Sequence, residues 1–411
     1  MSAFIHISKN ASLAGTVANL PASKSISNRV LILNALGGNQ SELSNLSEAN
    51  DTKLMKQLVN STDQVLDVED AGTTMRFLTA YLAISNQQKI LTGTERMKLR
   101  PIGILVEALR KLGANIKYLE KEGFPPLEIH GFGDQQTNRL SIRGDVSSQY
   151  ISALMMIAPV LPEGLTLTLE GKVGSRPYIE MTASLMRKFG ASVTVHEAVI
   201  EIAHQAYKPC RYTVEADWSA ASYWFAFSAL ATNAEIILPN IAMRSLQGDR
   251  VIVDMMEQLG VKAEPRGNTL LLTKKDFHPE FSWDFTHCPD LAQTVAVVCA
   301  AKGIKGTFTG LESLRIKETD RINALHQELE KIGAQLIETG SDWKLIPTQK
   351  LPDTFPSFNT YLDHRMAMAF APLACLADIS IENPLVVKKS YPGFWNDLKK
   401  IGFKVFENEA H

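Results

Sequence analysis

The stretch ALHQELEKIGAQLI (324–337) decides the fold of this chain, because its pattern returns four more times along the sequence. Apolar residues at helical spacing lead into a glycine, and a run typical of a β-strand follows the glycine. The other copies are LVEALRKLGANI (105–116), SLMRKFGASVTV (184–195), DMMEQLGVKA (254–263) and WNDLKKIGFKVF (395–406). Glycine at this place ends a helix, since it adopts a positive φ without steric cost. The sequence therefore predicts a repeated unit of helix and strand.

The period of the repeat predicts how the units are grouped. The glycines stand at 113, 190, 260, 333 and 402, so neighbouring copies are 69 to 77 residues apart. A sixth copy without the glycine, LMKQLVN, occupies 54–60, and strand-like runs lie at 165–171, 235–241 and 269–275. Six units of about 68 residues are too large for a solenoid repeat and too small for separate domains. We therefore expect an α/β (α+β) fold in which small subfolds group into two larger domains.

The bulk composition is that of an ordinary globular protein. Of the 411 residues, 45% are hydrophobic and 21% are charged, and the formal net charge is −2. We therefore expect no nucleic acid and no membrane partner, and any anionic ligand must be met by locally gathered cations. The longest apolar runs, 150–161 and 366–377, are too short to span a bilayer, and the first 20 residues lack the pattern of a secretory signal.

The four cysteines do not have the spacing of a metal site. They are Cys210, Cys288, Cys299 and Cys375, and each lies among apolar or small residues. This setting is typical of buried free thiols, which persist in a reducing compartment. The sequence therefore predicts no metal and a cytoplasmic location.

A basic residue precedes each repeat glycine, near the expected start of the helix. These residues are Arg100, Arg176, Arg250, Arg321 and Lys389, at distances of 10 to 14 residues from the glycine. A cation at a helix N-terminus opposes the helix dipole, which favours anions there. Five cations in equivalent places predict an anionic ligand that helix N-termini and basic side chains bind together. The alternative is a set of solvated basic residues.

Four motifs in the first half of the chain suit an oxyanion, although each also fits a capped turn or an ordinary helix start. They are PASKSISNR (21–29) with Lys24, Ser25 and Arg29, EDAGTTMRF (69–77) with Gly72 and Arg76, GDVSSQY (144–150) with Ser147, Ser148 and Gln149, and SRPY (175–178) with Ser175 and Tyr178. Gly72 would let backbone N–H groups approach an anion closely. Together, cations, hydroxyl groups and helix starts predict a site for phosphate or carboxylate.

The sharpest motif is LRIKETDR (314–321). Lys317 and Arg321 are four residues apart, so on a helix two like charges would share one face unless something negative lies between them. Glu318 is one candidate for that negative group, and a bound ligand is the other. A carboxylate embedded in an anion-binding helix start is also what proton transfer beside a phosphate requires.

DHRMAMAF (363–370), KKSYPGFW (388–395) and CPD (288–290) extend the set. Asp363 is expected to cap a helix, which leaves Arg365 as an anion binder and His364 as a structural residue. Lys389 repeats the pattern of a cation before a helix. Asp290 is either a helix cap or a carboxylate that faces the cations and acts as a base.

These motifs, in this order, resemble the 5-enolpyruvylshikimate-3-phosphate synthase family. The resemblance runs from about residue 21 to residue 395 and rests on PASKSISNR, AGTTMRF, TGTERMKLRPI, SSQYISAL, SRPYIEMT, LRIKETDR, DHRMAMAF and KSYPGFW. It implies a two-domain enolpyruvyl-transferase fold of six βαβαββ-type repeats, three per domain, in agreement with the six copies found above. It further implies a discontinuous domain of 1–21 plus 216–411, an inserted domain of 22–215, and an active site in the cleft between them.

The resemblance also implies a reaction. The enolpyruvyl group of phosphoenolpyruvate would pass to the 5-hydroxyl of shikimate 3-phosphate, with release of phosphate, by addition–elimination through a tetrahedral intermediate. The expected catalytic residues are Asp290 as the base, assisted by Lys317, with Glu318 as the acid and with Lys24. No cofactor and no metal are implied, the partners are these two small molecules, and the chain is expected to act as a monomer.

The same resemblance assigns the binding residues. Shikimate 3-phosphate would be bound by Lys24, Ser25, Arg29, Ser147, Ser148, Gln149, Ser175, Tyr178, Asp290 and Lys317. Phosphoenolpyruvate would be bound by Lys24, Gly72, Arg100, Gln149, Arg321, Arg365 and Lys389. Glycine at position 72 further implies sensitivity to glyphosate.

Three features depart from the family pattern. Asp70 and Ser313 stand where the family usually has asparagine, and the stretch between Asp51 and Asp70 is short. The short stretch predicts a shortened first repeat, and Asp70 places a carboxylate near the phosphoenolpyruvate site unless it pairs with an arginine. Two alternatives stay open: a catalytically impaired paralogue that binds phosphoshikimate, and a UDP-N-acetylglucosamine enolpyruvyl transferase. The latter usually has a loop cysteine, which GTERMKLRP (93–101) lacks.

Overall fold

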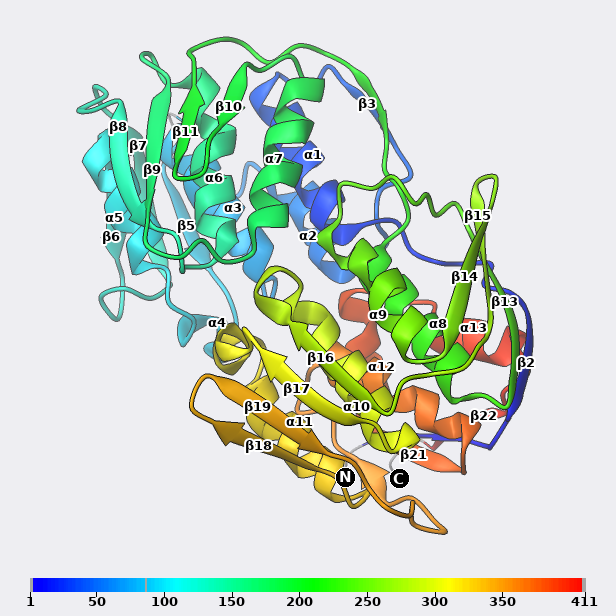
Figure 1. The fold of residues 1–411 in the computed structure, drawn as a ribbon. Coiled ribbons are helices and arrows are strands. Elements are labelled where there is room, and N and C mark those ends of the chain that lie inside the picture. Colours follow the sequence, from blue (N-terminus) through cyan, green and yellow to red (C-terminus); the bar gives the residue numbers. More distant parts are fainter. Residues whose placement is uncertain (1–2, 86, 409–411) are drawn as a thin grey trace. The chain divides into compact units, whose positions relative to one another are not determined.

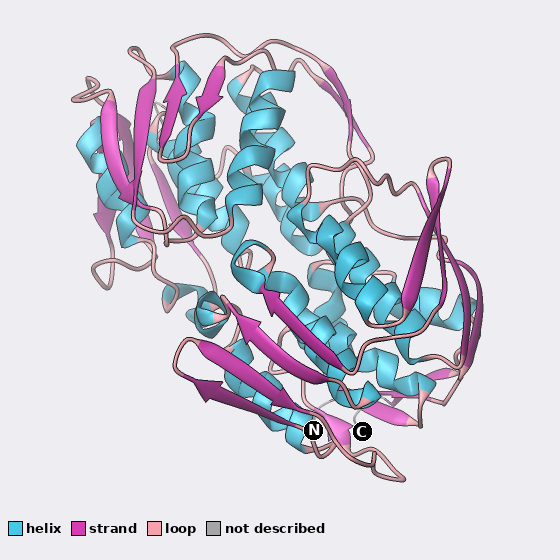
Figure 2. Ribbon diagram, viewed as in Figure 1, coloured by secondary structure: helices cyan, strands magenta, loops and turns pink. Residues whose placement is uncertain are grey.

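The structure is a computed structural model that describes residues 3–85 and 87–408. The chain divides into two compact units: unit 1 is Met1–Pro21 with Glu215–His411, and unit 2 is Ala22–Val214. Residues 1–2 and 409–411 of the expected discontinuous domain lie outside the described residues. In each unit the helices gather in the middle and sheets cover them from outside (Figures 1 and 2).

Both units are built from one motif of strand, helix, strand, helix and two further strands. One copy in unit 1 consists of β16 (Glu280–Asp284), α10 (Ala292–Lys302), β17 (Lys305–Thr309), α11 (Arg321–Glu330), β18 (Gln335–Thr339) and β19 (Asp342–Ile346). Its sheet has the order β16-β17-β19-β18, in which β16 and β17 are parallel and β19 is antiparallel to both neighbours. A parallel pair needs a crossover, which α10 supplies, and a hairpin closes the sheet. The predicted βαβαββ repeat is confirmed.

Strands from the N-terminal segment complete the other two sheets of unit 1. The sheet β14-β15-β13-β2 contains β2 (Ser12–Thr16), β13 (Asn233–Pro239), β14 (Val261–Arg266) and β15 (Thr269–Lys274), with α8 (Trp218–Leu230) and α9 (Ile252–Gln258). The sheet β20-β21-β1-β22 contains β1 (Phe4–Ile7), β20 (Ser357–Phe358), β21 (Ile379–Glu382) and β22 (Val405–Asn408), with α12 (His364–Phe370) and α13 (Phe394–Lys400). The N-terminal segment belongs to unit 1 because it supplies one strand to each of these two sheets.

Unit 2 has two complete sheets. The sheet β4-β5-β7-β6 consists of β4 (Val65–Asp67), β5 (Lys89–Thr92), β6 (Ala114–Tyr118) and β7 (Leu127–Phe132), with α3 (Gly72–Ala83), the short α4 (Glu95–Lys98) and α5 (Gly103–Leu112). The sheet β10-β11-β9-β8 consists of β8 (Arg139–Arg143), β9 (Leu165–Glu170), β10 (Val193–Val195) and β11 (Val199–Ile202), with α6 (Ser148–Ile157) and α7 (Arg176–Lys188). Both have one parallel pair and a closing hairpin, as in unit 1.

The third sheet of unit 2 is short. It has only β3 (Glu42–Ser44) and β12 (Arg211–Thr213), paired in parallel, with α1 (Lys24–Leu36) and α2 (Asn50–Leu58). Residues 59–64, all of them described, connect α2 to β4 without a closing hairpin, whereas four of the other repeats have one, at β6–β7, β10–β11, β14–β15 and β18–β19. The prediction of a shortened first repeat is confirmed.

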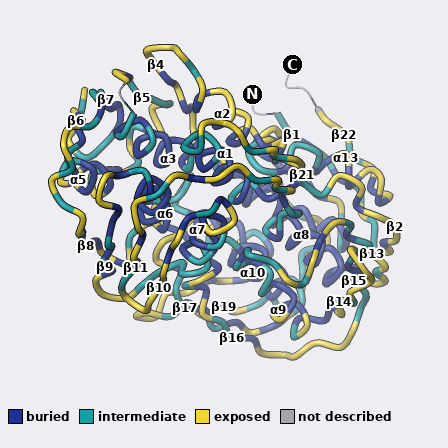
Figure 3. Tube along the Cα trace, turned by 90° about the horizontal axis from the view of Figure 1, so that it is seen from above, coloured by how far each residue is buried: buried dark blue, intermediate teal, exposed yellow. Residues whose placement is uncertain are grey.

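Most repeats contribute one buried helix and one amphipathic helix. Nearly every residue is buried in α8, α10 and α12 of unit 1 and in α3 and α6 of unit 2. Of these helices, α3, α6, α8 and α10 are labelled in Figure 3, which colours buried residues dark blue. The amphipathic partners end at the repeat glycines, whose φ values are 120° at Gly113, 84° at Gly190, 100° at Gly260, 80° at Gly333 and 104° at Gly402. The predicted helix stop is therefore confirmed at all five positions. Within the described residues, no helix is both long enough and apolar enough to cross a membrane.

A buried carboxylate holds the loop that leads into α12. Glu328 on α11 is fully buried and accepts hydrogen bonds from Lys331 Nζ (2.6 Å), the Tyr361 hydroxyl (2.7 Å) and the Asn359 N–H (3.0 Å). Tyr361 and Leu362 have φ values of 52° and 57°, a left-handed conformation that is costly for residues other than glycine. Glu328 therefore stabilises a strained turn from which α12 begins.

We expect Glu328→Ala to lower the free energy of unfolding by roughly 3 kcal/mol, because it leaves a buried N–H and a lysine without their acceptor. Urea unfolding of the whole protein measures this loss of stability. The matched control is Glu330→Ala on the exposed side of the same helix, which should change stability by less than about 0.5 kcal/mol. Equal effects of the two substitutions would contradict this role of Glu328.

Candidate active site

Arg321 is the centre of a charged cluster in unit 1. It is the first residue of α11, and its side chain is only 2% exposed. The guanidinium donates to Asp363 Oδ2 (2.7 Å), Glu318 Oε2 (2.7 Å) and Asp290 Oδ1 (3.0 Å). Burial opposes the charged form, but these three carboxylates outweigh it, so the pKa of Arg321 is raised above its ordinary value. The cluster keeps a buried cation fully charged.

Asp290 joins two arginines. It lies in the 3-10 helix η4 (Pro289–Leu291), which precedes α10 and leaves the capping position to another residue. One carboxylate oxygen accepts from Arg321 and the other from Arg365 Nη2 (2.8 Å). Burial alone would raise the pKa of Asp290, but Arg365, Lys317 and Arg321 hold it well below its ordinary value. Of the two interpretations of Asp290, the helix cap is wrong, and its carboxylate faces the cations.

α12 brings the second arginine to the cluster. Asp363 caps this helix by accepting from the Arg365 N–H (2.8 Å), as predicted. The Arg365 guanidinium reaches Asp290 and also the hydroxyl of Tyr223 on α8 (3.4 Å). Because Asp363 also binds Arg321, one carboxylate fixes the start of α12 and the side chain that begins α11.

The KETDR segment (317–321) adds the carboxylate of Glu318 and Lys317, and Lys389 from the KKSYPGFW motif joins them. Glu318 binds Arg321 and lies 3.4 Å from Lys389 Nζ. Lys317 follows the 3-10 helix η5 (Glu312–Ile316), and α11 begins only at Arg321. The expectation that Lys317 and Arg321 share one helix face is therefore wrong, because the backbone is extended at Lys317. Burial is the largest effect on the pKa of Lys317 and lowers it.

In unit 2 a buried arginine lies among hydroxyl groups. Arg29, in the second turn of α1, is 2% exposed and donates to Thr182 Oγ1 (2.7 Å), Ser152 Oγ (3.1 Å) and the Ser25 carbonyl (2.9 Å). Its guanidinium also lies 5.8 Å from the centre of the Tyr178 ring. Burial lowers the pKa of Arg29 to about 10. Since these contacts are all neutral, the buried charge favours an anion nearby.

Lys24 brings three helix starts together. It is the first residue of α1, which Ser23 caps, and its Nζ lies 3.0 Å from Asp51 Oδ2 in the first turn of α2. The backbone carbonyl of Asp51 accepts from Thr74 Oγ1 (3.1 Å) in the first turn of α3. The starts of α1, α2 and α3 therefore meet at one place in unit 2.

Gly72, the first residue of α3, makes room for Arg100. A Cβ added to Gly72 would lie only 2.7 Å from Arg100 Nη2. Arg100 follows α4, and its Nη1 lies 3.5 Å from the Asp70 carbonyl oxygen. The close approach of the Arg100 guanidinium is a second reason for glycine at position 72, beside the expected approach of backbone N–H groups to an anion. The carboxylate of Asp70 accepts from the Thr94 hydroxyl.

The starts of α6 and α7 complete the set in unit 2. Ser147 caps α6 by accepting from the Gln149 N–H (3.4 Å), and the Gln149 amide donates to Thr73 Oγ1 (3.0 Å) on α3. Ser148 lies in the first turn of α6 and is buried. Ser175 precedes α7 with a left-handed φ of 51°, and its side chain makes no capping hydrogen bond. Together with the Arg29 contacts, these bonds bring together the first two turns of α1, α6 and α7 and the first turn of α3.

Two of the five basic residues at helix starts have local partners instead. Arg176 donates to Glu180 Oε1 (3.2 Å) and to two backbone carbonyls of the β10–β11 turn. Arg250 lies 3.9 Å from Asp254 on the next turn. Pairs of this kind at the surface contribute little to stability or function. Regular spacing of cations alone therefore does not mark a ligand site.

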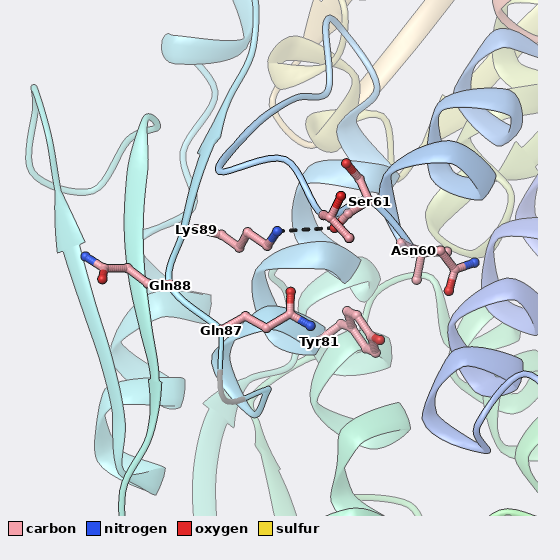
Figure 4. A pocket seen from close by; sticks show the side chains of 8 residues that line it. Asn60, Ser61, Tyr81, Gln87, Gln88 and Lys89 are labelled. Atoms are coloured by element: carbon pink, nitrogen blue, oxygen red, sulfur yellow. Dashed lines mark hydrogen bonds between the residues drawn. The ribbon is translucent and has the colours of Figure 1, made fainter.

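A separate hollow of about 500 Å³ lies in unit 2, away from these residues. It opens beside residues 59–62, in the segment that replaces the missing hairpin, and Tyr81 and Gln87–Lys89 form its other side (Figure 4). Lys89 donates to the backbone carbonyls of Ser61 and Asp63 (3.2 and 2.6 Å). Within the described part of the chain, no group of three or more His, Cys, Asp or Glu residues is placed to hold a metal ion.

Comparison with known proteins decides which family has these motifs. A family model described as EPSP synthase (3-phosphoshikimate 1-carboxyvinyltransferase) matches residues 7–62 and 55–398. The chain belongs to the EPSP synthase family. The resemblance found in the sequence is thereby confirmed over nearly its whole length.

Individual relatives agree with this family. A protein of Bacteroides fragilis (strain YCH46) named 3-phosphoshikimate 1-carboxyvinyltransferase is 48% identical over 390 residues, which cover 94% of this chain and 95% of the relative. A protein of the same name from Salmonella schwarzengrund (strain CVM19633) is 36% identical over 416 residues, with 93% and 95% covered. An EPSP synthase structure from Acinetobacter baumannii matches all of both chains with a TM-score of 0.76 at 19% identity, which supports the fold alone.

Sequence reasoning missed the partners that position the expected EPSP synthase residues. These are Asp51 beside Lys24, Ser152 and Thr182 beside Arg29, Thr73 beside Gln149, and Tyr223 beside Arg365. A signal was present for two of them. Ser152 follows Ser148 by four residues and Thr182 follows Tyr178 by four, so each lies one helical turn beyond a motif residue on the same face.

The lowered pKa of Asp290 predicts how the stability of the protein changes in acid. The folded protein stabilises the ionised form of Asp290. Its contribution to the free energy of unfolding is therefore complete above the ordinary carboxyl pKa of about 4, and it is lost as the pH falls toward the pKa of Asp290 in the folded state. We therefore expect wild type to be more stable than Asp290→Asn near neutral pH, with a difference that shrinks below about pH 4. Urea unfolding across this range measures it, with Asp353→Asn at an exposed site as the control. A difference that does not change with pH would contradict stabilisation of the ionised carboxylate by its basic neighbours.

Proposed function

We propose that this chain transfers the enolpyruvyl group of phosphoenolpyruvate to the 5-hydroxyl of shikimate 3-phosphate and releases phosphate, and that both units bind the substrates together. The observation that carries the proposal is the Arg321 cluster, where two buried guanidinium groups share the carboxylate of Asp290. Such a cluster suits a reaction of anions that needs a base, and it occurs in a chain 48% identical to a 3-phosphoshikimate 1-carboxyvinyltransferase.

Phosphoenolpyruvate carries a phosphate and a carboxylate, so its site needs several cations. Arg321, Arg365 and Lys389 of unit 1 lie in one network of ion pairs, linked by Asp290 and Glu318. Guanidinium groups bind oxyanions with paired hydrogen bonds, which gives both affinity and orientation. With Lys24, Gly72, Arg100 and Gln149 of unit 2, these three residues form the phosphoenolpyruvate site that we propose.

Shikimate 3-phosphate needs phosphate donors and a surface for its ring. The start of α6 offers Ser147, Ser148 and Gln149, and Ser175 at the start of α7 has a side chain not engaged in capping. Arg29 supplies positive charge behind them and lies over Tyr178, whose ring would flank the sugar-like ring of the substrate. The remaining members of this proposed site are Lys24, Ser25, Asp290 and Lys317.

The charges around Asp290 suggest how the base becomes active. Its lowered pKa makes Asp290 a weak proton acceptor as long as both arginines donate to it. An anionic substrate that binds Arg321 and Arg365 takes over part of that donation. The pKa of Asp290 then rises toward its ordinary value, so the carboxylate accepts the proton of the 5-hydroxyl only when phosphoenolpyruvate is bound.

Lys317 and Glu318 serve the other proton transfers that we propose. Burial lowers the pKa of Lys317, which makes its ammonium a better proton donor and its amine easier to form beside Asp290. Glu318 lies between Arg321 and Lys389; in its protonated form it gives its proton to C3 of phosphoenolpyruvate, and it takes a proton back from C3 as phosphate leaves. The proton that Asp290 takes from the 5-hydroxyl leaves with the phosphate. Lys24 neutralises charge on the tetrahedral intermediate.

The test is release of inorganic phosphate from shikimate 3-phosphate and phosphoenolpyruvate, with each substrate omitted in turn. We expect release only when both substrates are present, since the enolpyruvyl group must have an acceptor. Binding of shikimate 3-phosphate without phosphate release would point instead to the impaired paralogue. Release with UDP-N-acetylglucosamine in place of shikimate 3-phosphate would support the other alternative.

Neither alternative is favoured by the site. The shortened first repeat lacks its closing hairpin, but Lys24 at the start of α1 and Asp51 at the start of α2 are in place. Asp70 accepts a hydrogen bond from Thr94, so this carboxylate has a local partner. We also propose that the chain acts as a monomer in the cytoplasm, and its four free thiols are in keeping with a reducing compartment.

Gly72→Ala tests the placement of Arg100. The added methyl group would lie 2.7 Å from Arg100 Nη2, so the guanidinium must move. We expect the KM for phosphoenolpyruvate to rise by about tenfold or more, the size of one lost charged hydrogen bond, while the KM for shikimate 3-phosphate changes little. Gly133→Ala, at an exposed site with room for a methyl group, is the control. An unchanged KM for phosphoenolpyruvate would remove Arg100 from this site.

A further inference from the structure

A second carboxyl group, Asp249, is buried beside the Arg321 cluster. It lies in the 3-10 helix η2 (Gly248–Val251) between β13 and α9, and it is 3% exposed. One of its oxygens accepts from the Ser219 hydroxyl in the first turn of α8. The preceding Gln247 binds the same helix start, since its side-chain oxygen accepts from the Trp218 N–H (3.0 Å). Asp249 is therefore held firmly against α8.

The other oxygen of Asp249 has no hydrogen-bond partner among the described residues. No basic side chain of the described chain lies within ion-pair distance of Asp249. A buried carboxylate with one bare oxygen and no cation is costly, whereas the protonated acid is neutral and can donate to Ser219. The start of α8 does not supply the missing partner, because Asp217 already caps this helix by accepting from the Ala220 N–H (2.9 Å).

α8 connects Asp249 to the catalytic residues proposed above. Ser219 and Tyr223 are four residues apart, so they lie on the same face of α8 in successive turns. Tyr223 contacts Arg365, and Arg365 binds Asp290. The ionisable groups that face Asp249 are Asp217 on α8, Cys288 and Asp290 around η4, and Arg365 on α12. Arg365 is the only cation among these groups, and it already forms an ion pair with Asp290.

We propose that Asp249 is a positioning residue for the Arg365–Asp290 pair, and that it must hold a proton for an anionic substrate to bind there. Protonated, it allows Arg365 to exchange Asp290 for the substrate. When Asp249 is ionised, it adds a second negative charge beside Asp290. This charge repels the substrate anion and attracts the Arg365 guanidinium, which is then less available to the substrate. Burial and the charge of Asp290 raise the pKa of Asp249 to about 7, which centres this change of protonation near neutral pH.

This inference rests on the proposed function for the identity of the anion, phosphoenolpyruvate. The substrate adds negative charge near Asp249, so its binding should draw a proton from the solvent when the pH is above about 7. Affinity should then fall by up to about tenfold per pH unit in that range, because each unit removes most of the protonated form. The effect should appear in KM, while kcat, measured with the site filled, should change much less.

The test compares wild type with Asp249→Asn, which keeps the shape and cannot ionise. Calorimetric titration with phosphoenolpyruvate near pH 8, in buffers of different ionisation enthalpy, counts the protons taken up. We expect up to one proton for wild type and for the control Asp254→Asn, an exposed residue of the next helix, and close to none for Asp249→Asn. The KM of Asp249→Asn should also lose its alkaline rise.

Two further measurements test the proposal in ways that neither loss of turnover nor poor folding of a variant could imitate. Ser219→Ala removes the hydrogen bond that favours ionised Asp249, so the alkaline rise in KM should move to higher pH, which loss of structure would not produce. Thermal unfolding tests Asp249 without substrate: wild type should lose stability relative to Asp249→Asn as the pH rises from about 4 through 7.

Equal proton uptake and an equal thermal profile in wild type and Asp249→Asn would overturn the proposal and leave Asp249 as a structural partner of Ser219. Absence of phosphate release by wild type would instead overturn the proposed function, and the thermal comparison would still decide whether Asp249 carries a proton.

Discussion

A guanidinium group removed from water needs hydrogen-bond acceptors to replace the water, and at Arg321 in unit 1 these acceptors are three carboxylates. Its three carboxylate partners come from η4, from the turn before α11 and from the cap of α12. Removing any one of them would leave buried charge unbalanced, which costs several kcal/mol. The ion-pair cluster therefore fixes the starts of three elements at once, and two of the carboxylates that neutralise Arg321, Asp290 and Glu318, are those that we propose for proton transfer.

The two units hold their buried arginines in opposite ways. Arg321 has three carboxylates, so it binds an anion only by exchanging one of them, and that exchange changes the pKa of the carboxylate released. Arg29 has hydroxyl groups and a backbone carbonyl, so it attracts an anion without giving up a partner. Affinity for a phosphate is thus best supplied by unit 2, whereas unit 1 is suited to coupling anion binding to a change in basicity.

Much of the fold could be predicted from the sequence, because each repeat has the same local pattern of helix, glycine and strand. The glycines at 113, 190, 260, 333 and 402 mark helix ends in the sequence and have positive φ in the structure. The network around Arg321 could not be predicted, since it joins residues 290, 318 and 363 through tertiary packing. The helix expected across Lys317 failed for a local reason: Asp320 caps α11 by accepting from the Asn323 N–H (3.1 Å), so the helix begins only at Arg321.

The repeat itself explains where the residues of the proposed site and its helix caps occur. Lys24, Gly72, Ser148, Asp290, Asp363 and Lys389 all lie in the connection from a strand to the following helix, or in its first turn. In a βαβ unit such connections emerge at the carboxyl ends of the parallel strands, where helix N-termini also favour anions. The missing hairpin of the first repeat would have followed α2 on the path to β4, outside these connections. The fold can therefore lose two strands there without losing a single residue of the proposed site.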